Sequence, residues 1–102
     1  MTPAEGAPGA ATGDPAGRRV TIVNQKGLHA RAAARFAKLA AQFDARVTVS
    51  RGGQTVTALS IMGLMMLAAA KGSKVDLRAE GPHAEAALDA LAALVERGFD
   101  ES

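Results

Sequence analysis

The 102-residue sequence contains no cysteine, tryptophan or tyrosine, and its only aromatic side chains are three phenylalanines. The absence of cysteine excludes a disulfide framework and any zinc site built on thiolates. It agrees with a reducing cytosol, so we expect a cytoplasmic protein. Because aromatic side chains are so few, we do not expect a sheet surface on which nucleic-acid bases stack.

Strong charge and long apolar segments are also missing. The formal net charge is only +2, and no block of Lys and Arg stands out, which argues against nucleic acid as a partner. The longest apolar run, ALSIMGLMMLAAA, is too short to cross a bilayer, so no membrane association is expected. The N-terminus also lacks the basic start and apolar block of a secretory signal.

The composition predicts one small domain with a segment outside it at each end. Residues 1–17 are rich in Gly, Ala and Pro without a hydrophobic period, which predicts a disordered N-terminal extension. Residues 18–98 carry the patterns of a folded domain, and residues 99–102 are expected to form a C-terminal tail. The expected core is aliphatic and surrounds Phe36 and Phe43.

Two hydrophobic periods follow one another along this domain. Period-2 alternation predicts strands in RRVTIVNQ, on both sides of the glycine turn RGGQ, and in SKVDLRAEG. Helical spacing predicts helices over residues 30–42, over residues 61–72 and within PHAEAALDALAALVERGF. The order βαββαβα predicts an α+β fold, in which a four-stranded antiparallel sheet has helices on one face.

The candidate site lies in KGLHARAAARFAKLA, where His29 stands directly before a predicted helix. The start of a helix presents unpaired N–H groups and partial positive charge, which disfavour the imidazolium form and suit an anion. A neutral imidazole nitrogen is a nucleophile, and the guanidinium of Arg31 suits phosphate oxygens. This pattern indicates a transient phosphohistidine. The residues alone also allow a plainer interpretation, a polar helix-start residue beside a surface arginine.

A second histidine, His83, also stands near a predicted helix start, after Gly81 and Pro82. The residue two positions later is Glu85, whose carboxylate would repel a phosphoryl group. We therefore interpret His83 as a solvated residue at a helix end.

The strings GLHARAAARFAKLA, VTVS, ALSIMGLMMLAAAKGSKVDLRAEG and EAALDALAALVE, in this order, resemble the HPr family. HPr is the histidine-containing phosphocarrier of the bacterial phosphoenolpyruvate-dependent phosphotransferase system. The resemblance covers about residues 18–98. It implies an open-faced β-sandwich with three helices on one face of the sheet. It also implies a relay, in which enzyme I phosphorylates the histidine and the histidine passes the group to an enzyme II A-type acceptor.

The resemblance also implies the roles of single residues. His29 is the phosphorylated residue, through the ring nitrogen that faces the helix start. Arg31 holds phosphate oxygens, together with the backbone N–H groups of Ala30 and Arg31. The resemblance implies no metal and no cofactor. It implies a phosphocarrier, which is formally grouped with the phosphotransferases but is not a free-standing enzyme. Ala32 replaces the usual proline of the family, so we expect a less rigid helix start with the nucleophile retained.

Ser60 and the residues after it carry two further predictions. Ser60 precedes IMGLMM and is a predicted N-cap. In many members of the family, a serine at this position is phosphorylated by HPr kinase/phosphorylase. The resemblance therefore implies this enzyme as a candidate partner. Leu64 and Leu67 are expected in the core, whereas a short helix that is apolar on every side must expose the rest. The predicted docking surface for enzyme I and the acceptors comprises Ile61, Met62, Met65 and Met66, with Arg31 and Lys38 or Arg35.

Three functions remain open from the sequence. The first is a phosphocarrier, and the second is a regulatory HPr-like protein of the nitrogen-related branch that acts through partner binding. The third is a small-molecule-binding domain in which His29 and Arg31 hold an anion without turnover. No residue separates the first two. We expect a monomer, because Thr48, Ser50 and Thr57 would make the open face of the sheet polar.

Overall fold

The computed structural model describes residues 16–101. Its strands are β2 (Ala16–Thr21), β3 (Arg46–Arg51), β4 (Gln54–Thr57) and β5 (Lys74–Glu80), and its helices are α1 (Ala30–Ala40), α2 (Ile61–Met66) and α3 (Ala84–Glu96). Most of the extension expected over residues 1–17 lies outside the described residues. Ala16 and Gly17 already belong to the sheet, where they pair with Ala79 and Arg78.

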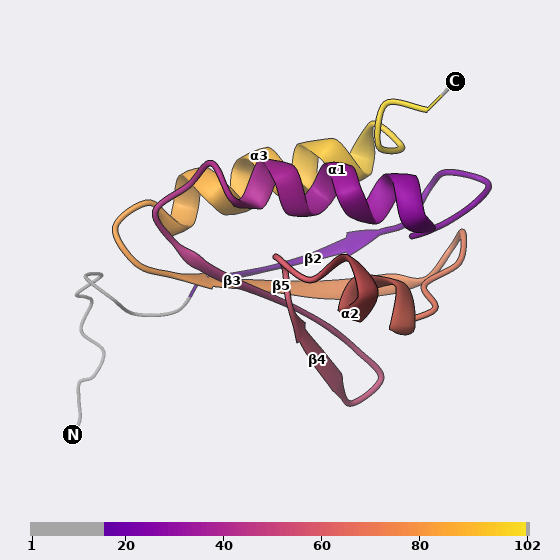
Figure 1. Cartoon of the computed structure of the whole chain (residues 1–102), viewed down its shortest axis with the longest axis horizontal. Helices are drawn as coiled ribbons and strands as arrows, with labels where there is room; N and C mark the ends of the chain where they lie inside the picture. Colours follow the sequence, from indigo (N-terminus) through magenta and orange to yellow (C-terminus); the bar gives the residue numbers. More distant parts are fainter. Residues whose placement is uncertain (1–15, 102) are drawn as a thin grey trace.

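The four strands form one antiparallel sheet in the order β2-β5-β3-β4. Helices α1 and α3 lie side by side over one face of this sheet, and α2 lies beside α1 and next to β4 (Figure 1). The β3–β4 hairpin turns at Gly52 and Gly53, and both have positive φ, as primed turns require. The predicted antiparallel α+β fold with the order βαββαβα is therefore confirmed.

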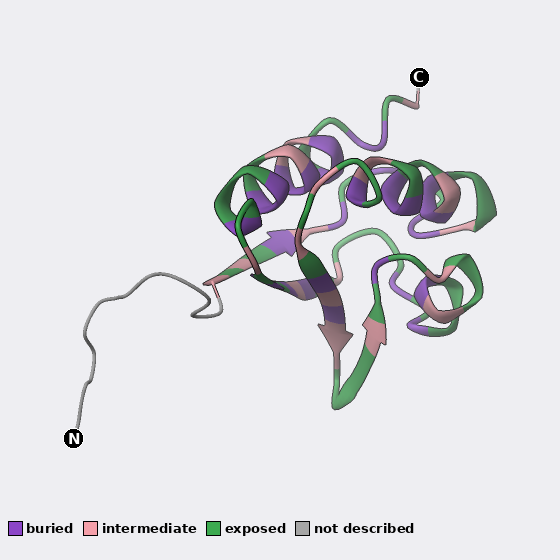
Figure 2. Ribbon diagram, turned by 60° about the vertical axis from the view of Figure 1, so that its left-hand side comes forward, coloured by how far each residue is buried: buried purple, intermediate pink, exposed green. Residues whose placement is uncertain are grey.

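The core lies between the sheet and the helices, where their buried faces meet (Figure 2). Alternate strand residues point into it, and the helices supply an apolar stripe. Its side chains include Val20, Val47, Val49, Val75 and Leu77 from the sheet, Ala33 and Phe36 from α1, and Leu88, Leu91 and Val95 from α3. The other face of the sheet is polar and carries, for example, the ion pair between Arg19 and Asp76 at 2.8 Å.

The aromatic residues of the core differ from those expected. Phe43 is only partly buried, whereas Phe99 is fully buried together with Phe36. Residues 99–101, which were expected to be a tail, are therefore anchored in the fold. The reason is that the chain reverses after α3 and returns Phe99 to the core. No periodic pattern of hydrophobic residues in the sequence predicts this reversal.

The second helix ends before the predicted stop at Gly72. Ala68 has a φ of 53° and takes the chain out of the helix. The segment that follows makes backbone hydrogen bonds to the chain before α1. The carbonyl of Ala69 accepts from the N–H of Leu28 at 2.9 Å, and the carbonyl of Ile22 accepts from the N–H of Gly72 at 2.8 Å. These tertiary hydrogen bonds take the place of further helical turns.

Candidate functional site

The loop that carries His29 is held against the chain that follows α2. Gly27 has a φ of 65°, which is a conformation that favours glycine. Leu28, the next residue, is buried and donates its N–H to the Ala69 carbonyl. His29 follows as the N-cap of α1. The backbone from which the ring projects is thus fixed on both sides, by a turn before it and by a helix after it.

The first turn of α1 leaves N–H groups available at His29. The backbone of His29 is extended, and its side chain makes no capping hydrogen bond. The N–H of Ala33 donates to the His29 carbonyl at 2.8 Å. The N–H groups of Ala30 and Arg31 precede this bond and have no acceptor within the helix. A helix start with such unpaired N–H groups suits an anion.

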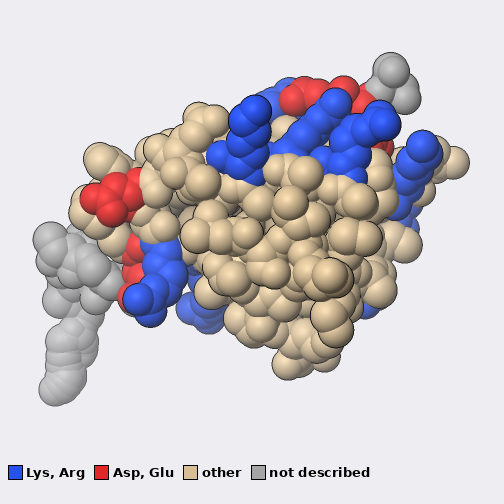
Figure 3. Space-filling model, in the orientation of Figure 1, with Lys and Arg blue, Asp and Glu red and all other residues tan. Residues whose placement is uncertain are grey.

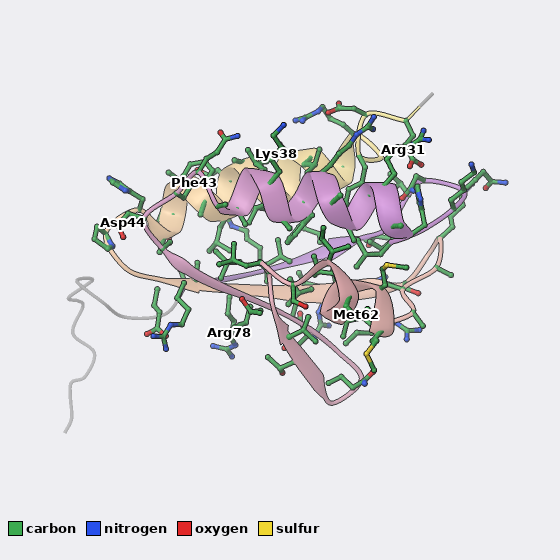
Figure 4. All side chains as sticks on the ribbon, viewed as in Figure 1. Arg31, Lys38, Phe43, Asp44, Met62 and Arg78 are labelled. Atoms are coloured by element: carbon green, nitrogen blue, oxygen red, sulfur yellow. The ribbon has the colours of Figure 1, made fainter. Side chains whose placement is uncertain are left out.

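Basic side chains gather over α1 on the face of the molecule shown in Figure 3. Arg31 is exposed and projects from the first turn toward the end where the C-terminal residues lie (Figure 4). Arg31, Arg35 and Lys26 line one open hollow of about 480 Å³. Lys26 also lines a second hollow, which includes His29. Lys26 therefore places a positive charge near the His29 ring.

A carboxylate also contacts the His29 ring. Oε2 of Glu101 pairs with Nε2 of His29, and Oε1 of Glu101 accepts a 2.9 Å hydrogen bond from Nδ2 of Asn24. The hydrogen bond from Asn24 lowers the pKa of Glu101 below its ordinary value; His29 and Lys26 add to this effect, and partial burial opposes it. With its pKa lowered, the Glu101 carboxyl group is ionised at neutral pH.

Residues 98–101, which we call the C-terminal segment, bring this carboxylate to the ring. Gly98, Phe99 and Asp100 all have positive φ, at 70°, 58° and 61°, and so reverse the chain after α3. The side chain of Phe99 is fully buried, and its carbonyl accepts a hydrogen bond from Arg35. Arg97 pairs with Asp100 at 2.8 Å. The position of Glu101 is therefore set by packing and by two polar contacts of its neighbours.

Sequence reasoning did not identify Asn24, Phe99 or Glu101 as site residues. Asn24 is buried, and its Nδ2 also donates to the Gly27 carbonyl at 2.9 Å. Its Oδ1 is buried without a hydrogen-bond partner in the described part of the chain. One available signal was Phe99, since few residues of this chain are aromatic and a helix-stopping glycine precedes it. Glu101 gave no signal, because its contact depends on the chain reversal.

The structure confirms the predicted N-cap at Ser60 and the exposure of the apolar side chains after it. Oγ of Ser60 accepts a 2.9 Å hydrogen bond from the N–H of Gly63. Leu64 and Leu67 are buried, whereas the four predicted docking residues are exposed: Ile61, Met62, Met65 and Met66. Figure 3 shows a broad uncharged area over α2 and β4. It adjoins the basic side chains of α1, because α2 packs beside α1.

The structure separates two other positions from this site. His83 is the exposed N-cap of α3, at the opposite end of the molecule (Figure 1). Its neighbour Glu85 pairs with Arg18 at 3.2 Å. A larger hollow, of about 800 Å³, opens near the C-terminal end of α1 and is lined by residues such as Phe43 and Leu59. Because it contains none of the groups around His29, it is not the candidate site.

Residues 16–101 contain neither a metal-binding cluster nor a membrane-spanning helix. Within that range, no group of three or more His, Cys, Asp and Glu side chains is placed to bind a metal ion. None of the helices described there combines the length and the apolar character that a membrane span needs.

Comparisons with known proteins agree on one family. A family model described as PTS-HPr, the PTS HPr component phosphorylation site, matches residues 16–97. Phosphocarrier protein HPr of Cupriavidus necator is 51% identical over 84 residues, which cover 82% of this chain and 94% of that protein. Phosphocarrier protein NPr of Shewanella violacea is 48% identical over 85 residues, which cover 83% of this chain and 93% of that protein. HPr-C-His from Thermoanaerobacter tengcongensis, known from a crystal structure, is 40% identical with a TM-score of 0.81, and the match covers 85% of this chain and 98% of that chain.

Proposed function

Because this chain belongs to the HPr family of phosphocarrier proteins of the phosphotransferase system, we propose that it relays a phosphoryl group through His29. The group comes from phosphorylated enzyme I and goes to an enzyme II A-type acceptor. The observation that supports this most is the position of the His29 ring at a helix start that its own side chain leaves uncapped. A nucleophile and an anion-binding site thus lie at the same place.

The transfer can be written with the groups at this helix start. A ring nitrogen of His29 attacks phosphorus, and the bond from phosphorus to the donor breaks with its electron pair staying on the donor. The guanidinium of Arg31 and the N–H groups of Ala30 and Arg31 stabilise the phosphoryl oxygens. Ala32, in place of the usual proline, is fully buried in this first turn.

The exposed side chains of α2 are proposed to dock both the donor and the acceptor. Ile61, Met62, Met65 and Met66 provide a flexible apolar surface, and methionine adapts to partners of different shape. Exposed basic side chains of α1, Arg31 and Lys38 or Arg35, are proposed to add positive charge beside this surface. A partner that fits would present apolar residues surrounded by carboxylates.

Ser60 is the proposed regulatory position for HPr kinase/phosphorylase. A phosphate on Oγ would stand at the start of α2, where backbone N–H groups tolerate negative charge. The helix would then persist, and the added charge would lie between the docking side chains and the carboxylates of a partner. Phosphorylation would therefore weaken docking without unfolding the protein.

The second candidate function is that of a regulatory protein of the nitrogen-related branch. It is favoured by the similar identity of this chain to a relative named NPr and to one named HPr. Both branches use the same histidine chemistry and differ in their enzyme I and acceptors. Phosphorylation rates measured with the enzyme I of each branch would separate them. In either branch we propose a cytoplasmic monomer.

Labelling with enzyme I and radioactive phosphoenolpyruvate tests the phosphohistidine. We expect acid-labile, base-stable phosphate on the wild type and on His83→Ala, and none on His29→Ala. Arg31→Ala should be labelled roughly tenfold more slowly, since a charge-assisted hydrogen bond is lost. Arg46→Ala, at an exposed arginine on β3, is the matched control and should be labelled normally. Equal labelling of His29→Ala and wild type would show that the site is elsewhere.

A further inference from the structure

We infer that Glu101 is a positioning residue for His29: its carboxylate holds a proton on Nε2 and leaves the lone pair of Nδ1 free to attack phosphorus. This inference deepens the proposed function and rests on it. A neutral imidazole carries one proton on either of its two nitrogens, and only the unprotonated nitrogen is a nucleophile. Whatever fixes the proton therefore selects the atom that reacts.

The contact between Glu101 and His29 has the chemistry that this selection needs. An ionised carboxylate accepts hydrogen bonds and donates none, so the nitrogen it touches must be an N–H. The nitrogen it touches is Nε2. The side chain of His29 makes no capping bond to the helix, so Nδ1 is not engaged by the N–H groups of α1. The remaining lone pair therefore belongs to Nδ1.

The carboxylate is held at both of its oxygens. Oε2 contacts the His29 ring, and Oε1 accepts from Nδ2 of Asn24 at 2.9 Å. Asn24 is itself fixed, because it is buried and its Nδ2 also donates to the Gly27 carbonyl. Side-chain exposure is only 17% for Glu101 and 26% for His29, so water competes weakly for this pair. The orientation of the ring therefore follows from a chain of contacts that begins in the turn before it.

The carboxylate also matches the charge that develops during transfer. As the bond between Nδ1 and phosphorus forms, the ring retains its proton on Nε2 and becomes cationic. Glu101 then faces a positive ring and interacts with it more strongly than with the neutral one. No proton has to enter or leave, and the electron pair of the broken bond stays on the donor. An interaction that strengthens along the reaction accelerates it.

The fold gives this carboxylate a fixed position. The C-terminal segment is anchored by the fully buried Phe99 and by the hydrogen bond from Arg35 to the Phe99 carbonyl. The opposite effect of the same contact would be obstruction, in which Glu101 repels the incoming phosphoryl group. The two effects differ in sign and are separated by the kinetic experiment below.

The first experiment measures the proton position directly by nitrogen-15 NMR of the histidine rings at alkaline pH. In the wild type, we expect a larger fraction of the form protonated on Nε2 for His29 than for His83, which serves as an internal reference. Glu101→Ala should remove this difference, and Glu96→Gln, at an exposed carboxylate near the same end of α3, should preserve it. An unchanged His29 spectrum in Glu101→Ala would overturn the inference, whatever the outcome of phosphorylation.

The second experiment measures the rate of phosphorylation by enzyme I. Glu101→Gln keeps the shape of the side chain and removes its charge, and we expect labelling to slow by about tenfold. Glu101→Asp should recover part of the rate, and Glu96→Gln should retain all of it. A Glu101→Gln protein labelled as fast as the wild type, or faster, would overturn the positioning role. Failure to label the wild type would instead refute the proposed function and leave the NMR result intact.

Discussion

Gly27 lies directly against the backbone of Ala69, so closely that a Cβ built on Gly27 would stand 2.4 Å from the Ala69 carbonyl oxygen. This approach joins the loop before α1 to the chain that follows α2. The loop that carries His29 is consequently in direct contact with the segment that continues from α2. This close approach explains why a glycine stands two residues before the candidate nucleophile. Replacing Gly27 with alanine, which adds one methyl group, tests it.

Gly27→Ala should lower the free energy of unfolding by about 2 kcal/mol or more, because it combines a positive φ with a backbone clash. Urea denaturation measures this change. Gly53→Ala is the control, since Gly53 has a φ of 88° but nothing lies within 4 Å of an added Cβ. It should cost only roughly 1 kcal/mol. Equal losses in the two variants would mean that the contact with Ala69 relaxes freely.

Phe99→Ala should destabilise the protein by about 3 kcal/mol, since the lost ring is fully buried. The same variant should release the C-terminal segment and shift the NMR signals of the His29 ring. Phe43→Ala provides the comparison, because Phe43 is only partly buried, and it should cost less and leave those signals in place. A stable Phe99→Ala protein with unchanged His29 signals would show that the segment is held by its polar contacts alone.

Ser60→Ala should lower the free energy of unfolding by about 1 kcal/mol, because the hydrogen bond to the Gly63 N–H is lost. Ser60→Asp should stay close to wild-type stability, since a carboxylate also caps a helix. In the labelling assay, we expect only Ser60→Asp to be phosphorylated more slowly, through a weaker encounter with enzyme I. If both variants are labelled slowly, the loss of the hydroxyl group is the cause, and the predicted effect of the negative charge is wrong.

Stability should fall as the solution becomes acidic, through three carboxyl groups. Hydrogen bonds from Asn24, Arg19 and Arg97 lower the pKa values of Glu101, Asp76 and Asp100, respectively. A carboxyl group with a lowered pKa in the folded state stabilises the fold above its unfolded pKa, which is about 4. This contribution is lost as the pH falls through the folded pKa. Urea denaturation between about pH 6 and pH 3 would show the decline, and Glu101→Gln should flatten it.

Local physics was enough to predict most of the fold. The alternation of Val47 and Val49 fixed which face of β3 is covered, and two glycines fixed the hairpin turn. The spacing of Leu88, Leu91 and Val95 defined the buried stripe of α3, and Ser60 marked the start of α2. Each of these features depends on residues a few positions apart, so a pattern in the sequence can express it.

The features that could not be predicted from the sequence depend on tertiary contacts. The end of α2 depends on two hydrogen bonds of the segment after it: Gly72 donates its N–H to Ile22, and Ala69 accepts from the N–H of Leu28. The burial of Phe99 depends on three consecutive residues with positive φ, two of which are not glycine. The carboxylate at His29 depends on that reversal in turn. His29 and Arg31 could be proposed as site residues from the sequence, because the chemistry of a helix start is local. Glu101, by contrast, reaches the ring from the far end of the chain.

The position of β5 between β2 and β3 has a consequence for the order in which the chain folds. The β3–β4 hairpin closes a short loop and can form early, but β2 pairs only with β5, as in Val20 opposite Val75. That pairing closes a long loop and carries a larger entropic cost. On a ribosome, the first described strand to be synthesised must therefore wait, without a partner, until the β5 residues up to Ala79 have emerged. The loop that presents the histidine also lacks its partners at first, because Ala69 and Gly72, which hydrogen-bond to Leu28 and Ile22, lie after α2.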